Sequence, residues 1–253
     1  MAVSSATIDL FYRKLFTETP NWSTPFPNHD EARRWGKICE YLSEIPQPLI
    51  HGVRQRLRIL DVGCGRGWLT RLASVYGQCD GVDPVSSSIE LARAYFPGLT
   101  FHVGTVADLL RSPGFQPYDV VMTSEVIEHV EDKEAFVSNL VTCLVPAGHV
   151  ILTTPRGEMF RQWLRLGYEP QPVEAWISER KLRALFARHR AVPIKQDRVY
   201  LDLPGMSFLH RLCASRKVAL ALQAAGLTCV GKALQHLAGF YQVWWFQVQA
   251  SDS

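Results

Sequence analysis

Three glycines at alternate positions, with an acid just ahead of them, are the first residues whose types and spacing could do chemistry. Asp61 is followed by Gly63, Gly65 and Gly67, after an apolar run at residues 59–62 and before a second apolar segment. This order predicts a buried strand, a tight turn and a helix. Glycine lets a ligand approach the main chain, and a helix start offers free N–H groups. The loop therefore predicts a small-molecule site.

A second acid ends the next predicted strand. Asp83 closes the segment 79–83 and lies twenty residues after Gly63. In NAD enzymes an acid at this place binds ribose hydroxyls, but their glycines follow the spacing Gly-x-Gly-x-x-Gly, which differs from this loop. Asp83 therefore predicts a ribose contact. The alternative is a helix cap, although Ser87 and Glu90 already fit a capping box for the following helix.

A dense polar segment follows the fourth predicted strand. Glu125, Glu128 and His129 are spaced i, i+3 and i+4, so on the first turn of a helix they would share one face. Histidine titrates near neutral pH and is a candidate base, with the glutamates orienting it or holding an amino group. The three side chains could instead hold a divalent ion. Enzymes that hold a metal with a similar segment supply a further histidine after the fifth strand, and residues 156–176 here contain none, so the sequence favours no metal.

These residues need an open, mostly parallel sheet to bring them together. Apolar runs alternate with amphipathic segments, which predicts an α/β fold with helices on both faces of the sheet. In such sheets ligands bind beyond the carboxyl ends of the strands. The predicted strands lie at residues 59–62, 79–83, 99–103, 118–123, 149–153, a stretch ending at 201, and 241–248.

The glycine loop, Asp83 and the segment 125–130 together resemble the class I S-adenosylmethionine (SAM) methyltransferases, most closely the ubiquinone-biosynthesis O-methyltransferase type. The likeness covers residues 58–201. It implies a Rossmann-like, seven-stranded sheet with an antiparallel last strand, and SAM as the cofactor. Thr105 stands where the family often has an acid beneath the adenine. The cofactor contacts that the resemblance implies are Asp61, Gly63, Cys64, Gly65, Gly67, Asp83, Pro84, Thr105, Val106, Ser124 and Glu125.

The regions outside this likeness are expected to shape the acceptor pocket. Residues 1–50 form an N-terminal helical segment, and 51–253 form the methyltransferase domain with insertions at 156–177 and 202–240. The resemblance implies that the N-terminal segment folds over the cofactor as a lid. The candidate pocket residues are aromatic: Tyr12, Trp22, Trp35, Trp163 and Tyr168.

One helix of the N-terminal segment can be placed in detail. Asn28 or Asp30 fits the cap of a helix that ends near Ser43. The apolar residues of this helix predict its buried face. They are Ala32, Trp35, Ile38, Cys39 and Leu42.

Composition narrows the function further. The 253 residues allow one sizeable α/β domain, and a hydrophobic content of 47% is enough for its core. A net charge of +3 without a dense Lys/Arg cluster argues against a nucleic-acid partner. Six cysteines are scattered singly, no signal peptide is visible, and no apolar run approaches about 18 residues. We therefore expect a cytoplasmic protein without a membrane partner.

The expected function is transfer of the SAM methyl group to a hydroxyl, or an amine, of a small molecule. His129 would remove the acceptor proton, with Glu125 and Glu128 beside it. Two alternatives stay open. One is a small-RNA 2′-O-methyltransferase with a Glu/Glu/His metal site, and the other is a SAM-binding protein without catalysis. The sequence leaves open the acceptor, the methylated atom and the oligomeric state.

Overall fold

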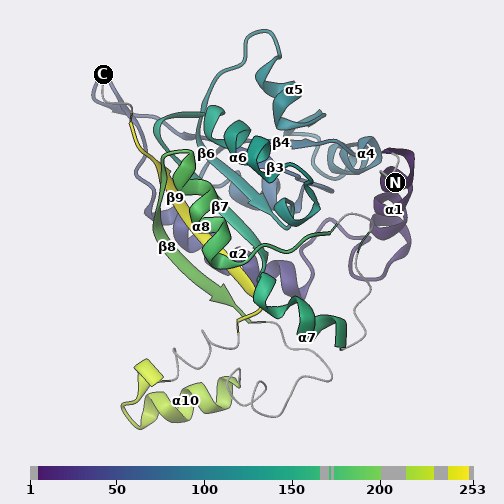
Figure 1. The fold of residues 1–253 in the computed structure, drawn as a ribbon. Helices are drawn as coiled ribbons and strands as arrows, with labels where there is room; N and C mark the ends of the chain where they lie inside the picture. The colour runs from purple at the N-terminus through teal and green to yellow at the C-terminus, as the bar shows by residue number, and fades with distance from the viewer. Residues whose placement is uncertain (1–4, 166–170, 172–173, 201–214, 231–238, 251–253) are drawn as a thin grey trace.

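One seven-stranded sheet carries the fold in the computed structural model of the chain, which describes residues 5–165, 171, 174–200, 215–230 and 239–250 (Figure 1). The strands are β3 (Leu57–Val62), β4 (Gly77–Asp83), β5 (Thr100–Val103), β6 (Tyr118–Ser124), β7 (Leu144–Pro155), β8 (Ala191–Val199) and β9 (Tyr241–Val248). Their order is β5-β4-β3-β6-β7-β9-β8. All pairs are parallel except those of β9, which is antiparallel to β7 and β8. The predicted sheet is therefore confirmed.

Successive residues of the central strands enter opposite cores. In β3, Ile59 packs on one side of the sheet and Leu60 on the other. In β9, Trp245 joins the core of Ile59, while Trp244 joins the core of Leu60. Side chains alternate between the two faces of a strand, so a sheet covered on both faces needs continuous apolar runs. This is why the strands could be recognised from the sequence.

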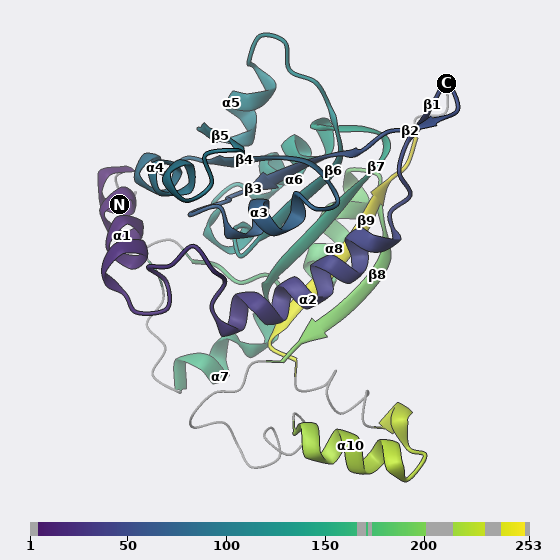
Figure 2. The ribbon, with the colours of Figure 1, turned by 180° about the vertical axis from the view of Figure 1, so that it is seen from behind.

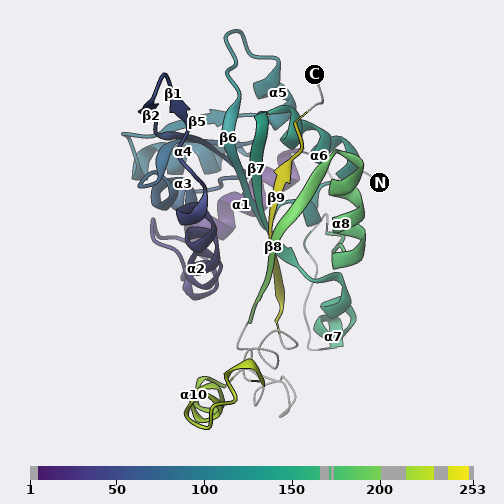
Figure 3. The same cartoon turned by 90° about the vertical axis from the view of Figure 1, so that its left-hand side faces the viewer.

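Helices cover both faces of the sheet (Figures 2 and 3). One face packs against α2 (His29–Glu44) and α3 (Trp68–Ala73), and α4 (Ser86–Tyr95) packs beside β5. The other face packs against α5 (Val106–Leu110), α6 (Lys133–Thr142) and α8 (Glu179–Arg188). The first helix, α1 (Ser5–Glu18), lies against α4. It therefore lies at the end of the sheet where the glycine loop is.

Helix α2 has the predicted cap, and its buried face is partly the predicted one. The Asn28 side chain accepts hydrogen bonds from the first turn, and Glu31 completes a capping box. The predicted face was partly wrong because Ala32 is exposed, while the charged residues Glu31 and Arg34 are buried. Both find charged neighbours elsewhere in the fold, as described below. Ile38 and Leu42 are buried as predicted, so charge pairing adds Glu31 and Arg34 to the apolar buried face.

Helix α4 starts without the predicted capping box. Its N-cap is Val85, which makes no side-chain cap. Ser87 instead donates to Oδ1 of Asp9 in α1, from its backbone N–H at 3.4 Å and from its hydroxyl at 3.1 Å. The capping box of Ser87 with Glu90 was therefore wrong. This polar contact fastens α1 to α4.

The remaining elements are short. A hairpin of β1 (Leu49–Ile50) and β2 (Val53–Arg54) precedes the sheet, and the turn η1 (Ile127–His129) follows β6. After β7 come η2 (Gly157–Met159) and α7 (Phe160–Arg165), and α10 (Arg216–Ala224) lies between β8 and β9. Much of the insertion predicted at 202–240 lies outside the described residues. No helix within the described part of the chain is long and apolar enough to cross a membrane.

Candidate active site

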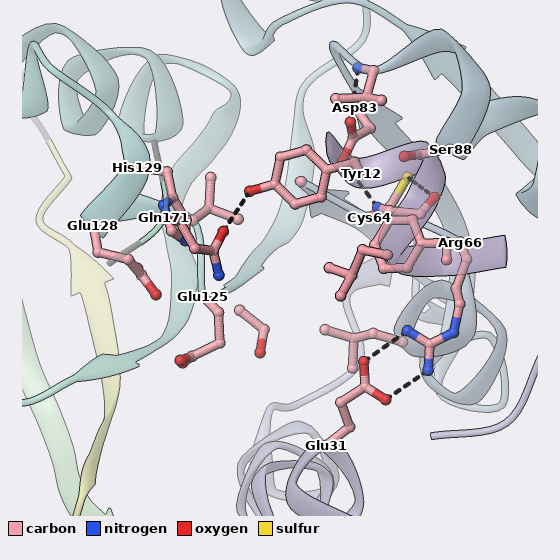
Figure 4. A pocket seen from close by; sticks show the side chains of 18 of the residues that line it. Tyr12, Glu31, Cys64, Arg66, Asp83, Ser88, Glu125, Glu128, His129 and Gln171 are labelled. Carbon is pink, nitrogen blue, oxygen red and sulfur yellow. Dashed lines mark hydrogen bonds and ion pairs between the residues drawn. The ribbon is translucent and has the colours of Figure 1, made fainter. Parts of the chain in front are cut away.

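A cavity of about 450 Å³ lies at the carboxyl ends of the central strands. It is walled by the glycine loop, the end of β4, the segment after β6, helices α1 and α2, and residues near the start of β9. Figure 4 shows Asp83 and Cys64 on one side of it, Glu128 and His129 on the other, and Tyr12 between them. This is the edge at which open α/β sheets bind their ligands.

Most of the predicted site residues line this cavity. They are Tyr12, Trp22, Asp61, Gly63, Cys64, Gly65, Asp83, Pro84, Ser124, Glu125, Glu128 and His129. Four other predicted residues that the structure describes lie outside its lining, namely Gly67, Trp35, Thr105 and Val106. Trp163 belongs to α7, but its side chain is outside the described part of the chain, as is all of Tyr168. The contacts predicted for these two residues stay predictions.

Hydrogen bonds join the glycine loop to the end of β4. The backbone N–H groups of Gly65 and Val85 donate to the two carboxylate oxygens of Asp83, each at 2.9 Å. Asp83 therefore fixes the loop and still borders the cavity. Gly67, the residue before α3, has a φ of +84°, and a Cβ there would lie 2.8 Å from the ring of Phe101. Gly67 allows α3 to pack closely, which explains why it is away from the cavity.

Two buried acids lie at this end of the cavity. Asp61 accepts a hydrogen bond from the Thr70 hydroxyl at 2.6 Å. Burial raises the pKa of Asp61 to about 7 and the pKa of Asp83 to about 6, because a carboxylate loses hydration when it is enclosed. A ligand that donates hydrogen bonds or brings positive charge would favour their ionised forms. This end of the cavity is therefore suited to hydroxyl groups and cations.

The chain leaves β6 through a left-handed turn. Glu125 has a φ of +61°, and its N–H donates to the carbonyl oxygen of Thr153 in β7 at 3.0 Å. Only the single turn η1 follows before the separate helix α6 begins at Lys133. The prediction that Glu125, Glu128 and His129 share the first turn of a helix was therefore wrong. The three residues border the cavity because of this turn.

Threonine hydroxyls of β7 hold the two glutamates. Thr153 donates to Oε1 of Glu125 at 3.0 Å, and Thr154 donates to Oε2 of Glu128 at 2.9 Å. Burial raises the pKa of both carboxyls above the usual range of glutamate, and the two charges oppose each other. Within the described residues, no group of three or more His, Cys, Asp and Glu side chains is arranged to hold a metal ion. The role predicted for Glu125 and Glu128 stays a prediction.

Arg34 of α2 lines the cavity and was not predicted. Its Nε lies 4.0 Å from Oε1 of Glu125, and its guanidinium lies 4.6 Å from the ring centre of Tyr241. Arg34 is 4% exposed, and its Nε has no hydrogen-bond partner in the described part of the chain. A buried donor without a partner is costly. Arg34 is therefore a candidate binding residue, which its place in a helix of mixed charge did not signal.

The N-terminal segment is fastened to the glycine loop by Arg66. Its guanidinium donates to both carboxylate oxygens of Glu31, at 2.8 and 2.6 Å, and to the carbonyls of Thr24 and Phe26. It also lies 5.7 Å from the ring centre of Trp22, one of the predicted lid residues. Residues 19–31 therefore close one side of the cavity. Sequence reasoning missed this contact because its partners are far apart in the chain.

Helix α1 supplies the aromatic roof of the cavity. The hydroxyl of Tyr12 donates to Oε1 of Gln171 at 3.3 Å, which joins α1 to the opposite wall (Figure 4). Tyr12 also stacks on Phe16, with 5.9 Å between ring centres. The prediction that Trp35 lines the pocket was wrong, because its ring packs against Tyr76 and the core beneath α2. It lies on a different side of α2 from Arg34.

Thr105 and Val106 begin α5 instead of facing the cavity. Thr105 is the N-cap, and its hydroxyl lies 2.6 Å from Oδ2 of Asp108, while the Asp108 carboxylate accepts the Thr105 N–H in return. Val106 is buried in the core under that helix. Capping therefore explains this sequence pattern, and the structure gives no contact between the cavity and either residue.

The far end of the cavity is aromatic and acidic. Trp176, Phe240 and Tyr241 line it, with 5.3 Å between the ring centres of Trp176 and Phe240 and 4.7 Å between those of Phe240 and Tyr241. Glu174 lies beside them and accepts a hydrogen bond from the Trp176 indole. The sequence marked the 156–177 insertion as aromatic, but not that Trp176 is the ring at the cavity.

Comparison with known proteins identifies the family. The sequence profile of a methyltransferase domain matches residues 28–230, which is most of the chain. The chain belongs to this methyltransferase family. This confirms the resemblance that was drawn from the glycine loop and Asp83.

Curated relatives of this methyltransferase match part of its length. The ubiquinone biosynthesis O-methyltransferase of Rickettsia canadensis is 38% identical over 104 residues, which are 39% of this chain and 43% of the relative. The protein of the same name from Brucella ovis is 29% identical over 175 residues, or 59% of this chain and 68% of the relative. The match thus spans less than half of the Rickettsia protein.

Solved structures share the fold of this methyltransferase at low sequence identity. An S-adenosylmethionine-dependent methyltransferase from Mesorhizobium loti has a TM-score of 0.56 and 18% identity, covering 86% of this chain and 99% of that one. The magnesium protoporphyrin IX methyltransferase of Synechocystis with bound SAH has a TM-score of 0.52 and 15% identity, covering 98% and 90%. Because these similarities cover most of the chain, the shared fold includes the whole sheet as well as the glycine loop.

Proposed function

We propose that this chain is a SAM-dependent methyltransferase that methylates a hydroxyl group of a small molecule. The proposal rests on one observation above all. A single cavity joins the glycine loop and Asp83 on one side to Glu125, Glu128 and His129 on the other. The curated relatives named as ubiquinone biosynthesis O-methyltransferases support a hydroxyl acceptor.

The residues at the cavity fit SAM. Its ribose hydroxyls would donate to Asp83, and its carboxylate would accept hydrogen bonds from Arg34, whose Nε has no hydrogen-bond partner among the described residues. Ser88 offers a second such group, since its buried hydroxyl borders the cavity and has no partner among the described residues. Bound SAM supplies a methyl group on positively charged sulfur. The remaining task of the chain is to hold and deprotonate the acceptor.

His129 is the candidate base for that task. It borders the cavity on the side opposite Asp83, and its own turn is held by a hydrogen bond from its N–H to the Val126 carbonyl at 2.9 Å. An imidazole there would take the proton of the acceptor hydroxyl. Glu128 lies beside it, held by Thr154. Orientation of the acceptor by the cavity walls supplies much of the remaining rate.

The N-terminal residues 1–50 complete the proposal as a lid over the cofactor. The lid is supported by Tyr12 and Trp22 in the cavity wall and by the tie from Arg66 to Glu31. The insertions at 156–177 and 202–240 would shape the acceptor end. Trp176 and Phe240, at the limits of these insertions, support this division of the chain.

The decisive test is direct methyl transfer. The protein is incubated with SAM carrying a deuterated methyl group and with catechols, simple phenols, aryl amines or short RNA. Mass spectrometry then identifies the labelled product, and we expect the label on a catechol or phenol oxygen. SAH binding is measured separately by calorimetry. Labelled RNA would favour the RNA alternative, and SAH binding with no labelled product in any class would favour a protein without catalysis.

A further inference from the structure

The acceptor end of the cavity combines aromatic ring faces with carboxylates. Trp176, Phe240 and Tyr241 line it as a connected set of rings. Protein already uses one of these faces for a cation, because the Arg34 guanidinium lies 4.6 Å from the ring centre of Tyr241. Aromatic faces attract cations through the negative charge of their π systems. These rings can therefore attract a cation as well as exclude water.

Two carboxylates border the same space, and the fold holds both in place. Glu128 is 2% exposed and accepts the Thr154 hydroxyl. Glu174 accepts the backbone N–H of Gln171 at 2.8 Å and the indole N–H of Trp176. The backbone N–H of Ala175, next to Glu174, donates to the carbonyl oxygen of Glu128 at 2.7 Å, so the two carboxyl groups lie on adjoining segments. Burial raises the pKa of Glu128, and the charge of Glu174 raises it further. A positive charge placed near both would relieve this repulsion.

The cavity lining as a whole contains more acidic than basic side chains. Among the described lining residues, seven have carboxylate side chains and two have guanidinium groups. One of these guanidinium groups, that of Arg66, is already bound to Glu31. The other belongs to Arg34, and its nearest carboxylate is Glu125. The lining thus has more carboxyl groups than guanidinium groups, and SAM adds only one net positive charge.

We infer that the methyl acceptor carries a protonated amine, held by Glu128 and Glu174 against the ring of Trp176. This inference deepens the proposed function and rests on it. The amine is a recognition group, and the hydroxyl proposed above remains the methylated atom. Acceptors with a carboxylate or phosphate group are excluded by the same charges, because like charges repel strongly where water is scarce.

The inference is tested with three catechols that differ only in their side chain, which is aminoethyl, ethyl or carboxyethyl. Their affinities for the protein–SAH complex are measured by calorimetry. We expect the amine to bind about tenfold more tightly than the ethyl compound, as cation recognition by rings and carboxylates implies, and the acid to bind most weakly. Binding is the readout, so the result does not depend on turnover.

Two matched variants test whether Glu174 is the source of the preference for the amine. Glu174→Gln keeps the size of the side chain and should remove most of the preference for the amine, while the ethyl compound keeps its affinity. Glu158→Gln removes an exposed carboxylate outside the cavity lining and should change none of the three affinities. Both variants are first compared with the parent protein by thermal unfolding.

The possible outcomes separate this inference from the proposed function. Equal affinities for the amine and the ethyl compound, tighter binding of the acid, or binding of none of the three would overturn the inference while SAH binding still supports the proposed function. Absence of SAH binding would overturn the proposed function instead. The same three compounds, measured without SAH, would then still decide whether this end of the cavity prefers an amine.

Discussion

Arg66 in the glycine loop and Glu31 in α2 form a bidentate ion pair that is almost fully buried, with side chains 1% and 3% exposed. Glu31 also accepts the backbone N–H of Asn28 at 2.7 Å, as part of the cap of α2. One carboxylate therefore ties the loop, the helix cap and the N-terminal segment together. Planar, two-point contacts of this kind are the most specific that arginine makes.

Removing Arg66 should destabilise the fold strongly. Arg66→Met leaves the Glu31 carboxylate buried without its partner, which costs about 3–5 kcal/mol of unfolding free energy. Glu31→Gln should also be costly, because it leaves the buried Arg66 guanidinium without its carboxylate. Arg71→Met, at an exposed arginine of the nearby helix α3, serves as the control. Urea unfolding measures all three, and a cost for Arg66→Met no larger than that of the control would contradict the prediction.

Substituting Gly65 should abolish SAH binding while the fold persists. Gly65 has a φ of +50°, and a Cβ there would lie 3.3 Å from the ring of Phe16, at the cavity wall. The branched side chain of Gly65→Val would fill the approach to the main chain. Gly36→Ala is the control, because a Cβ at that position in α2 meets nothing within 4 Å. Calorimetry that finds normal SAH affinity in Gly65→Val would show that the ligand avoids this loop.

SAH affinity should fall at acidic pH because of Asp83. Burial raises its pKa to about 6, so below that pH the free protein holds a proton where the ribose hydroxyls must donate. Affinity should then drop by up to about tenfold per pH unit below 6 and stay level above it. In the protein without ligand, ionisation of Asp83 has the opposite effect, because it lowers the stability of the fold. The folded form keeps this proton longer than the unfolded form, so Asp83 lowers stability as pH rises from about 4 to 6.

Asp83→Asn separates the effect of Asp83 on the pH dependence of SAH affinity from the effects of the other titrating groups, including Asp61. The variant should bind SAH more weakly at pH 7, since charge-assisted hydrogen bonds contribute about 1.5–3 kcal/mol each. Its affinity should also change less between pH 5 and 7 than that of the parent protein. Calorimetry across that range gives both numbers. Parallel pH curves for the two proteins would mean that the ligand does not contact Asp83.

Deleting α1 should impair turnover more than folding. A chain without residues 1–18 loses Tyr12 and Phe16 from the cavity wall but keeps the segment bound by Arg66. We expect a small change in melting temperature and a large loss of kcat/KM, because lids exclude water and complete active sites. Tyr12→Phe, which removes only the hydrogen bond to Gln171, should have a milder effect. Full activity of the shortened chain would show that α1 is ordinary packing.

His129→Ala should lose turnover and keep its cofactor. Removing a general base costs about 10²–10⁴-fold in rate, whereas SAH affinity should be nearly unchanged because His129 lies across the cavity from Asp83. Methyl transfer by the parent protein should survive EDTA. Activity that EDTA abolishes and Mg²⁺ or Zn²⁺ restores would instead establish a metal site at the segment 125–129.

The sequence was informative wherever a short stretch decides the structure by itself. Apolar runs predicted the strands because both faces of this sheet are covered, and the spacing from Gly63 to Gly67 predicted the turn before α3. Asp83 could be placed because it ends a strand beside the first one. Each of these signals depends on neighbours along the chain or on one parallel pairing.

The rest of the site depends on contacts between distant segments. Arg34 looked like one charge among several in α2, and its place at the cavity follows from its neighbours Glu125 and Tyr241. The helical arrangement expected for Glu125, Glu128 and His129 failed for a related reason. A left-handed residue is usually glycine, and at Glu125 the bond from its N–H to Thr153 holds the turn instead. Nothing in the spacing could reveal that bond.

The place of β9 in the sheet has a consequence for synthesis on the ribosome. Within the described sheet, β8 is hydrogen-bonded to β9 alone, and β9 separates it from β7. When the nascent chain has emerged only as far as β8, that strand has no neighbour to join, and β7 presents an unpaired edge. Such edges invite association between chains. We therefore expect the nascent chain to be prone to aggregation until residues 241–248 leave the exit tunnel and pair with β7 and β8.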